Sequence, residues 1–577
     1  MLRREHGCKM KTYLSGNKPR ITECFDFDWY FYRGEKEPVP GEHYVETGVG
    51  WYRKRFRLDK TIGADERIFL RFDGVYMLAD VWVNGWKAGR HTYGYTPFEW
   101  DITQLLNGKN ENNVIDVRVD NSAQPGSRWY SGSGITRDVW IYRVKKAHIL
   151  PYGVWLRQTD VTAERALMRI ETGVVCENPD LPAPAPFFIE TEIYTPQGTL
   201  CAKDKKKIPE SGAATTAVCQ EFVIDTPVLW SPETPFLYEA VTKLYQGDAL
   251  LDEVHNRTGL RSAFFHKDRG FVLNGNRCKL NGVCLHHDGG CAGAAVPVEV
   301  WERRLHKLKE MGANAIRMAH NPPDPALLDL CDRMGFLVMD EAFDEWEILK
   351  GKEFGSNTHE SRGYSEWYEK CHEEDLRAML LRDRNHPCIV IWSIGNEVPD
   401  QQSDKGYLTA RHLKQICREL DPERPVTQAN DQICSEPCPA KVEFLRELDV
   451  VGYNYVGRWR NRAETFYDED RRTYPEWCMT GTENGGTGGI RGEYPMEMPE
   501  KEGWWRRPYY SAPVESGKLL RYTMSHDYVA GDFMWTGIDY LGKAHWPERS
   551  SSAGILDTCG FEKDGYYFYH FFNAVSK

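Results

Sequence analysis

Short segments in the first part of the chain alternate apolar and polar residues. In Asn113–Asp120, for example, every second side chain is apolar, a period of two that is typical of a strand with one buried face. Asn84-Gly85 is a dipeptide favoured in the type I′ turn of a β-hairpin. Further strands are predicted at Trp51–Arg57, Arg67–Phe72 and Ala79–Gly85. Residues 1–148 are therefore predicted to form an antiparallel, jelly-roll-like β-sandwich.

The strand pattern continues through residues 149–262, where proline-rich and lysine-rich segments interrupt it. A Pro-rich loop is expected around Pro179, Pro182, Pro184 and Pro186. The basic run Lys203–Lys207 is expected to be a solvated turn. This region is predicted to be a second, smaller sandwich of the immunoglobulin-like kind.

From about residue 263 the rhythm changes to helix, glycine and apolar strand. Glu299–Met311 has apolar residues at helical spacing and stops at Gly312, and Pro325–Met334 repeats the unit before Gly335. Helices that alternate with apolar strands predict a parallel sheet, and the length of this region fits an eight-fold β/α barrel. The eight candidate strands are Cys278–Cys284, Ala315–Ala319, Phe336–Met339, Ile389–Trp392, Pro425–Gln428, Val450–Asn454, Cys478–Thr482 and Gly531–Trp535. Residues 263–577 are thus predicted to form a TIM barrel.

Two glutamates stand where barrel strands end. Asn396-Glu397 follows the β-branched run Ile389–Trp392, and Glu483 follows the seventh strand. A carboxylate at such a place is costly to bury without a partner, which favours catalysis over packing. Strands on nearly opposite sides of a barrel direct their end groups across its mouth. Two facing carboxylates are what glycoside hydrolysis requires.

Composition narrows the class of protein. A net charge of −12 with no long basic run argues against a nucleic-acid partner. There is no stretch of eighteen apolar residues and no apolar core of a signal peptide, so neither a membrane partner nor secretion is expected. Sixteen cysteines without a C-x-x-C spacing read as reduced thiols, which suits the cytoplasm. The aromatic content of 13% fits sugar stacking, although most of these rings are expected in cores.

Several motifs resemble glycoside hydrolase family 2. The segment DRNHPCIVIWSIGNE at Asp383–Glu397 is similar to the acid/base signature of that family, and the order of two sandwiches and a barrel is also the family's. The resemblance covers nearly the whole chain. Further matches are SRWYSGSGITRDVW at Ser127–Trp140, NAIRMAHNPP at Asn314–Pro323, MDEAFDEW at Met339–Trp346, GYNY at Gly452–Tyr455 and GDFMWTGIDYLG at Gly531–Gly542.

The resemblance implies roles for the two glutamates and their neighbours. Glu397 would be the acid/base and Glu483 the nucleophile of a retaining glycosidase. Arg317 and Tyr455 would hydrogen-bond the nucleophile and keep it ionised. The alternative for Arg317 is a simple strand-end ion pair with Glu341.

The resemblance also implies a set of sugar-binding residues. Asn396 would hold the 2-hydroxyl, and His320 and Trp535 would line the sugar subsite. Asp288 and Asp344 are candidates for further sugar contacts. The alternatives are a helix-cap or turn residue for His320, a core residue for Trp535, and loop ion pairs for the two aspartates.

No metal or cofactor is expected. His286, His287 and Asp288 are three consecutive residues of types that bind metals. Adjacent residues of a strand point to opposite faces, however, so these side chains are not expected to converge.

The resemblance implies a β-galactoside, in an oligosaccharide or glycoconjugate, as the substrate. Glucuronidases of the family carry an Asn-x-Lys element that binds the sugar's carboxylate, and Glu548–Asp564 has none, although Lys563 is a candidate cation. A β-glucuronidase or β-galacturonidase, and a carbohydrate-binding relative without catalysis, are the alternatives. A mobile loop is expected at Gly485–Gly492. A homo-oligomer is left open.

Overall fold

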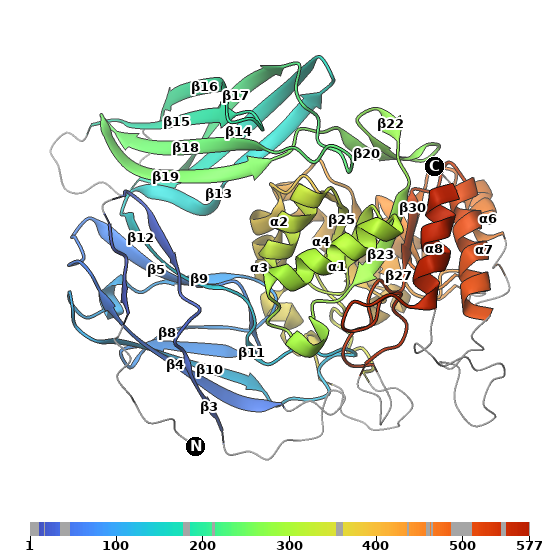
Figure 1. Ribbon diagram of the computed structural model, residues 1–577, viewed down its shortest axis with the longest axis horizontal. Coiled ribbons are helices and arrows are strands. Elements are labelled where there is room, and N and C mark those ends of the chain that lie inside the picture. The colour runs from blue at the N-terminus through green and yellow to red at the C-terminus, as the bar shows by residue number, and fades with distance from the viewer. Residues whose placement is uncertain are drawn as a thin grey trace.

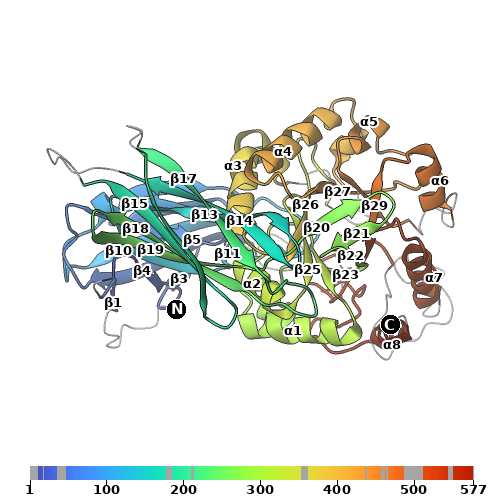
Figure 2. The ribbon, with the colours of Figure 1, turned by 90° about the horizontal axis from the view of Figure 1, so that it is seen from above.

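Two β-sandwiches lie along one side of a β/α barrel (Figure 1), and the view from above shows the same division (Figure 2). This is a computed structural model, which describes residues 11–16, 18–34, 47–176, 185–209, 214–352, 362–435, 438–456, 462, 465–485, 511–543 and 550–575, with only the backbone at 511–515 and 571–575. In these ranges no helix combines the length and apolarity that a bilayer crossing requires. The predicted order of sandwich, sandwich and barrel is confirmed.

The N-terminal sandwich consists mainly of antiparallel strands. One sheet has the order β1-β4-β10-β7-β8 with β3 beside β4, a second has the order β2-β12-β5-β9, and β6 pairs with β11. The bounds are β1 Thr12–Tyr13, β2 Ile21–Cys24, β3 Tyr30–Arg33, β4 Gly48–Leu58, β5 Glu66–Phe72, β6 Val75–Tyr76, β7 Ala79–Val83, β8 Trp86–His91, β9 Phe98–Asp101, β10 Asn113–Asn121, β11 Gly134–Ile135 and β12 Val139–Lys145.

The alternating pattern correctly located the buried face of these strands. Every second residue of β10 is buried, from Asn113 to Asn121. The predicted hairpin is also present, because Asn84 (φ 49°) and Gly85 (φ 84°) connect β7 to β8. Two consecutive positive φ angles are the requirement of a type I′ turn, which explains the Asn-Gly pair.

The second sandwich packs the sheet β13-β14-β17 against β16-β15-β18-β19. Its bounds are β13 His148–Val161, β14 Arg165–Val175, β15 Phe187–Tyr194, β16 Leu200–Lys207, β17 Thr215–Asp225, β18 Tyr238–Gln246 and β19 Ala249–Thr258. The prediction of a turn at Lys203–Lys207 was wrong, since these residues form the edge strand β16. Exposed lysines on an edge strand prevent pairing with other chains and hide the apolar alternation. Of the predicted Pro-rich loop, residues 177–184 lie outside the described part.

Eight parallel strands form the barrel after a small antiparallel sheet. That sheet comprises β20 Ala263–His266, β21 Gly270–Leu273 and β22 Asn276–Arg277. The barrel strands are β23 Leu280–Leu285, β24 Ala315–Met318, β25 Leu337–Glu341, β26 Ile389–Asn396, β27 Val426–Asn430, β28 Val450–Asn454, β29 Cys478–Glu483 and β30 Gly531–Met534. Hydrogen bonds from the Asn484 amide to the Phe533 carbonyl (3.0 Å) and from the Trp535 amide to the Asn484 carbonyl (2.8 Å) join β29 to β30.

Helices surround this ring, and the predicted helix ends are confirmed. Helix α1 ends at Gly312 (φ 101°), and α2 begins after Asp324, whose side chain accepts a hydrogen bond from the Ala326 amide at 2.9 Å. The bounds are α1 Val298–Met311, α2 Pro325–Met334, α3 Ser365–Asp383, α4 Gly406–Leu420, α5 Val442–Leu445, α6 Phe466–Thr473, α7 Ser511–Ser525 and α8 Asp564–Val575.

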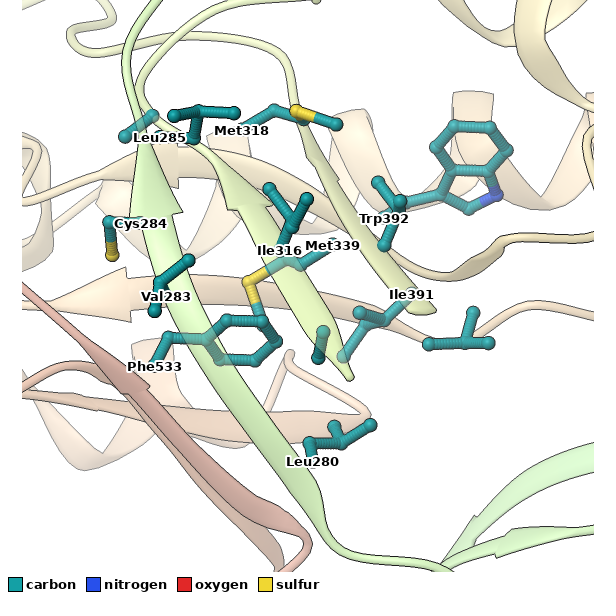
Figure 3. Close-up of a cluster of buried hydrophobic side chains, with 14 of the residues drawn as sticks. Leu280, Val283, Cys284, Leu285, Ile316, Met318, Met339, Ile391, Trp392 and Phe533 are labelled. Atoms are coloured by element: carbon teal, nitrogen blue, oxygen red, sulfur yellow. The ribbon is translucent and has the colours of Figure 1, made fainter. Parts of the chain in front are cut away.

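The barrel interior is packed with side chains. Figure 3 shows the Met339 side chain beside the Phe533 ring, between neighbouring strands. Gly282 lies opposite Phe533 in the register, and a Cβ added there would come within 2.3 Å of the Phe533 ring. A glycine is therefore required at residue 282 for the ring to fill the interior.

The first half of the Asp383–Glu397 segment joins the barrel to the second sandwich. The Asn385 side chain accepts a hydrogen bond from the Leu156 amide (2.9 Å) and donates one to the Val154 carbonyl (2.7 Å). The backbone carbonyl of Asn385 accepts a hydrogen bond from the Thr258 hydroxyl at 3.1 Å. Only the second half of the segment, from Ile389 onward, runs toward the barrel mouth.

A buried ion pair at the opposite end of the barrel makes stability dependent on pH. His386 Nδ1 lies 2.6 Å from Asp332 Oδ2. Burial lowers the pKa of His386, but the Asp332 charge outweighs burial and raises the pKa to about 9. Because the folded pKa exceeds the unfolded value of about 6.5, the pair stabilises the fold fully below about pH 6.5, and this stabilisation is lost as the pH rises through about 9.

The substitution His386→Gln should therefore lower the free energy of unfolding by roughly 3 kcal/mol at pH 6 and much less at pH 10. Urea unfolding of both proteins at pH 6, 8 and 10 measures this difference. His255→Gln, which removes an exposed histidine from the second sandwich, is the control. A destabilisation by His386→Gln that is the same at every pH would contradict the assignment.

Candidate active site

Two carboxylates stand at the C-terminal ends of barrel strands. Glu483 is the last residue of β29, and Glu397 directly follows β26. The backbone of Glu397 has φ 45°, a region that is costly for residues other than glycine, and its amide donates to the Ala429 carbonyl at 2.8 Å. The fold thus holds this carboxylate in a conformation that an extended strand does not provide.

Arg317 on β24 connects the residues around Glu483. Its side chain is fully buried, and Nη1 lies 2.9 Å from Glu483 Oε2 while Nη2 lies 2.8 Å from Glu341 Oε1. Nη2 also donates to Asn396 Oδ1 at 2.8 Å. Arg317 therefore makes both of the contacts that the sequence suggested, one to Glu483 and one to Glu341.

Asn454 connects the two catalytic candidates from β28. Its amide nitrogen donates to Glu397 Oε1 at 3.1 Å, and its amide oxygen accepts from the Thr482 hydroxyl at 2.7 Å. The same nitrogen lies 3.3 Å from Asn396 Oδ1. Glu397 and Glu483 consequently belong to one hydrogen-bond network at the barrel mouth.

Three cations surround Glu397. Arg128 Nη2 lies 3.1 Å and Lys350 Nζ 3.9 Å from Glu397 Oε2, and Lys543 adds its charge. Burial raises the pKa of Glu397, but these charges and the Asn454 amide lower it well below its usual range. The surroundings of Glu397 therefore favour its ionised form in the site without substrate.

Burial disfavours the charged forms of two groups on the other side of Arg317. It raises the pKa of Glu341 to about 7, although Arg317 and Ser393 bind the carboxylate. Burial and the Arg317 charge lower the pKa of His320 well below its usual value. His320 Nδ1 lies 3.0 Å from Glu341 Oε1, and Nε2 lies 3.9 Å from Glu483 Oε2. A neutral imidazole adds no second positive charge beside Arg317.

Aromatic rings form one wall of the mouth. Trp535 follows β30 and stacks with His320 at a centroid distance of 5.3 Å and an interplanar angle of 20°. Trp129, from the N-terminal sandwich, lies 5.1 Å from His320. Lys543 Nζ lies 5.2 Å from the Trp535 ring centroid. Trp535 is only 5% exposed, so it is part of the core as well as of this wall.

Asp344 lies next to Glu397. Oδ1 accepts hydrogen bonds from Lys350 Nζ at 2.7 Å and from Asn396 Nδ2 at 2.8 Å, and it lies 3.6 Å from Arg128 Nη2. Asp344 and Asn396 are thus both at the mouth, where the sequence placed them.

Tyr455 and Asp288 have different surroundings. Tyr455 (φ 50°) donates its backbone amide to the Glu483 carbonyl at 2.6 Å, and its ring centroid lies 6.5 Å from that of Trp535. The Asp288 carboxylate accepts the backbone amides of Gly290 at 2.9 Å and Leu541 at 3.3 Å. Asp288 therefore fixes two loops to each other through backbone amides, a contact that is neither the sugar contact nor the loop ion pair considered from the sequence.

The two neighbouring histidines have separate contacts. The His286 ring stacks on Tyr540 at a centroid distance of 3.6 Å, whereas His287 Nε2 lies 3.2 Å from the Ser131 carbonyl. Groups with metal-ligand spacing among the described residues are Asp332, His386 and Cys388, and His372, Glu373 and His412. Neither group lies at the mouth.

A cavity of ≈ 50 Å³ lies at the interface of the N-terminal sandwich and the barrel, beside these residues. Trp129, His320 and Asp344 contribute to its lining, together with Tyr76 and Tyr93. In the described part of the chain, Trp129 Nε1 and Asp344 Oδ2 are buried without a hydrogen-bond partner. One donor and one acceptor beside this cavity are thus without a partner among the described residues.

Sequence reasoning missed several residues of this site, among them Arg128, Trp129, Lys350 and Asn454. Arg128 and Trp129 lie within the SRWYSGSGITRDVW motif, which was noted without a role, Asn454 is the last residue of β28, and Lys350 lies on the loop that follows β25. Asn454 at the end of GYNY could have been found from its place at a strand end. The other three lie on loops, where no periodic pattern indicates which way a side chain points.

Comparison with known proteins places three family models along the chain. The model described as "Glycosyl hydrolases family 2, TIM barrel domain" matches residues 266–557. The model "Glycosyl hydrolases family 2" matches residues 154–261, and "Glycosyl hydrolases family 2, sugar binding domain" matches residues 36–145.

Individual relatives cover most of this chain. The β-galactosidase BoGH2A of Bacteroides ovatus is 36% identical over 90% of the chain and 64% of its own length. A putative β-glucuronidase of Formosa agariphila is 31% identical over 94% of the chain and 52% of its own length. A solved glycosyl hydrolase family 2 member from Bacteroides cellulosilyticus superposes with a TM-score of 0.80 at 30% identity, covering 95% of this chain and 70% of that one. The chain thus spans about half to two thirds of the length of these two curated relatives.

Proposed function

Because this chain belongs to glycoside hydrolase family 2, we propose that it hydrolyses terminal β-glycosides with retention of configuration. The single network that joins Glu397, Asn454, Asn396, Arg317 and Glu483 is the observation that carries this proposal. Such a mechanism requires carboxyl groups about 5 to 5.5 Å apart.

The proposed reaction has two steps. Glu483 Oε attacks the anomeric carbon while Glu397 gives a proton to the departing glycosidic oxygen, which forms a glycosyl ester and releases the aglycone. A water molecule then attacks the same carbon and gives its proton to Glu397, which frees the sugar and restores Glu483. Arg317, 2.9 Å from Glu483, supports the ionised nucleophile. The unpartnered Trp129 Nε1 and Asp344 Oδ2 are proposed to bind sugar hydroxyls.

We propose a β-D-galactoside as the substrate, carried on an oligosaccharide or glycoconjugate. The similarity to a β-galactosidase over 90% of the chain supports it. The pairing of Lys563 supports it as well, since Nζ lies 2.9 Å from both carboxylate oxygens of Asp539. Lys563 is therefore committed to a structural ion pair and does not serve an acidic sugar.

A second candidate is a β-uronide such as a glucuronide or galacturonide. Lys543, 5.2 Å from the Trp535 ring centroid, places a cation beside the aromatic wall. A carboxylate at C6 of a sugar stacked on Trp535 would be attracted to this charge. The similarity to a putative β-glucuronidase supports the same candidate.

A substrate panel with one charge-removing variant separates the two candidates. We expect kcat/KM to be highest for 4-nitrophenyl β-galactoside, and Lys543→Met to change this value less than about threefold. If the substrate is a uronide, Lys543→Met should lower kcat/KM for that uronide about a hundredfold, since the sugar carboxylate would lose its cationic partner. Steady-state kinetics with the galactoside, glucuronide and galacturonide measure both effects.

Lys267→Met, which removes an exposed lysine in the turn between β20 and β21, is the control for loss of charge. Faster turnover of a uronide by the wild type would overturn the galactoside proposal. Binding of these glycosides without turnover of any of them would indicate a carbohydrate-binding protein instead.

A further inference from the structure

We infer that Arg128 is a positioning residue for the acid/base, supplied by the N-terminal sandwich to a site in the barrel. Its guanidinium lies 3.1 Å from Glu397 Oε2 and 3.6 Å from Asp344 Oδ1. The side chains of these two acids are 7% and 9% exposed, so the contacts are shielded from water. The inference rests on the proposed function, because it assigns the control of Glu397 during that reaction.

The backbone just after Arg128 is fixed to one side of the barrel mouth, where β23 and β30 are neighbours. The Tyr130 amide donates to the Leu541 carbonyl at 3.0 Å, and the Ser131 carbonyl lies 3.2 Å from His287 Nε2. The Trp129 ring packs against His320. The guanidinium is therefore presented from a segment that is held by loops following β23 and β30.

Arg128 has two carboxylates within reach, and this determines its role. An acid/base must carry a proton in the first step and be a carboxylate in the second. A guanidinium at 3.1 Å favours the carboxylate form, which suits the attack of water and opposes the first step. When a glycosidic oxygen approaches Glu397 Oε2, the Arg128 side chain can move its hydrogen bond from Glu397 to Asp344, which lies nearly as close.

Other charged and polar groups face Glu397 from the surrounding elements. Of these, Lys350 Nζ is farther from Glu397 than Arg128 is, at 3.9 Å. The groups are Arg128 after β10, Asp344 and Lys350 after β25, Asp431 after β27, Asn454 on β28, Glu483 on β29 and Lys543 after β30.

The experiment compares Arg128→Gln with Arg128→Lys. For Arg128→Gln we expect the alkaline limb of the kcat/KM profile for a methyl β-galactoside to move to higher pH by at least one unit, a tenfold change in the proton affinity of Glu397. Arg128→Lys keeps a charge and should restore most of the wild-type profile. Arg137→Lys is the matched control, since Arg137 donates to the Pro322 carbonyl at 2.6 Å, also across the interface of sandwich and barrel, and to the Tyr95 carbonyl rather than to Glu397.

A second measurement does not require turnover. Glutamate labelled with ¹³C at Cδ reports the titration of Glu397 by NMR, with the resonance assigned from its loss in Glu397→Gln. We expect this titration to move to higher pH in Arg128→Gln and to stay unchanged in Arg137→Lys. Equal titration of Glu397 in wild type and Arg128→Gln would overturn the inference. A shifted titration in a protein that hydrolyses no glycoside would overturn the proposed function and leave the role of Arg128 intact.

Discussion

The substitution Glu483→Ala is expected to lower kcat for 4-nitrophenyl β-galactoside by about 10⁴-fold or more. Without the carboxylate no glycosyl ester forms, and the Arg317 guanidinium loses an acceptor at 2.9 Å. A loss of this size corresponds to about 5.5 kcal/mol of transition-state stabilisation. Initial rates over a range of substrate concentrations measure it.

Azide supplies a stringent control for this first prediction. A small anion can occupy the space of the missing carboxylate and attack the anomeric carbon once, so Glu483→Ala should yield the α-glycosyl azide with inverted configuration. Glu476→Ala, at an exposed position just before β29, should retain wild-type rates. Activity of Glu483→Ala within tenfold of wild type would show that another group is the nucleophile.

The substitution Glu397→Ala is expected to have an effect that depends on the leaving group. For methyl β-galactoside, whose leaving oxygen needs a proton, kcat/KM should fall by about 10² to 10⁴-fold. For a nitrophenyl glycoside the loss in kcat/KM should be much smaller, because nitrophenolate leaves without protonation. The ratio of the two losses measures general acid catalysis.

Azide also separates this role from that of Glu483. With Glu397→Ala and a nitrophenyl glycoside, azide should replace water in the second step and give the β-glycosyl azide with retained configuration. Equal losses for both leaving groups would argue that Glu397 acts through binding or folding. The α-azide from this variant would exchange the roles of the two glutamates.

The barrel and its two carboxylates could be predicted because their signals are local. The strand predicted at Cys478–Thr482 is β29 of the structure, one residue longer, and strand ends in a barrel share one face. Arg128 could not be predicted, since its approach to Glu397 depends on how two domains dock over a separation of 269 residues. The edge strand at Lys203–Lys207 was missed because exposed edges need no apolar alternation.

Asn385 of the barrel holds the second sandwich through two backbone groups. Asn385 contacts the backbone amide of Leu156 and the backbone carbonyl of Val154, and neither side chain of these residues takes part. Residues 154 and 156 of the second sandwich can therefore vary and keep these two contacts, provided that the strand path is preserved, whereas Thr258 contributes its hydroxyl. Asn385 itself has no such freedom, because few side chains offer a donor and an acceptor side by side. A sandwich exchanged at this junction would need matching backbone geometry at residues 154 and 156 and a hydroxyl at residue 258.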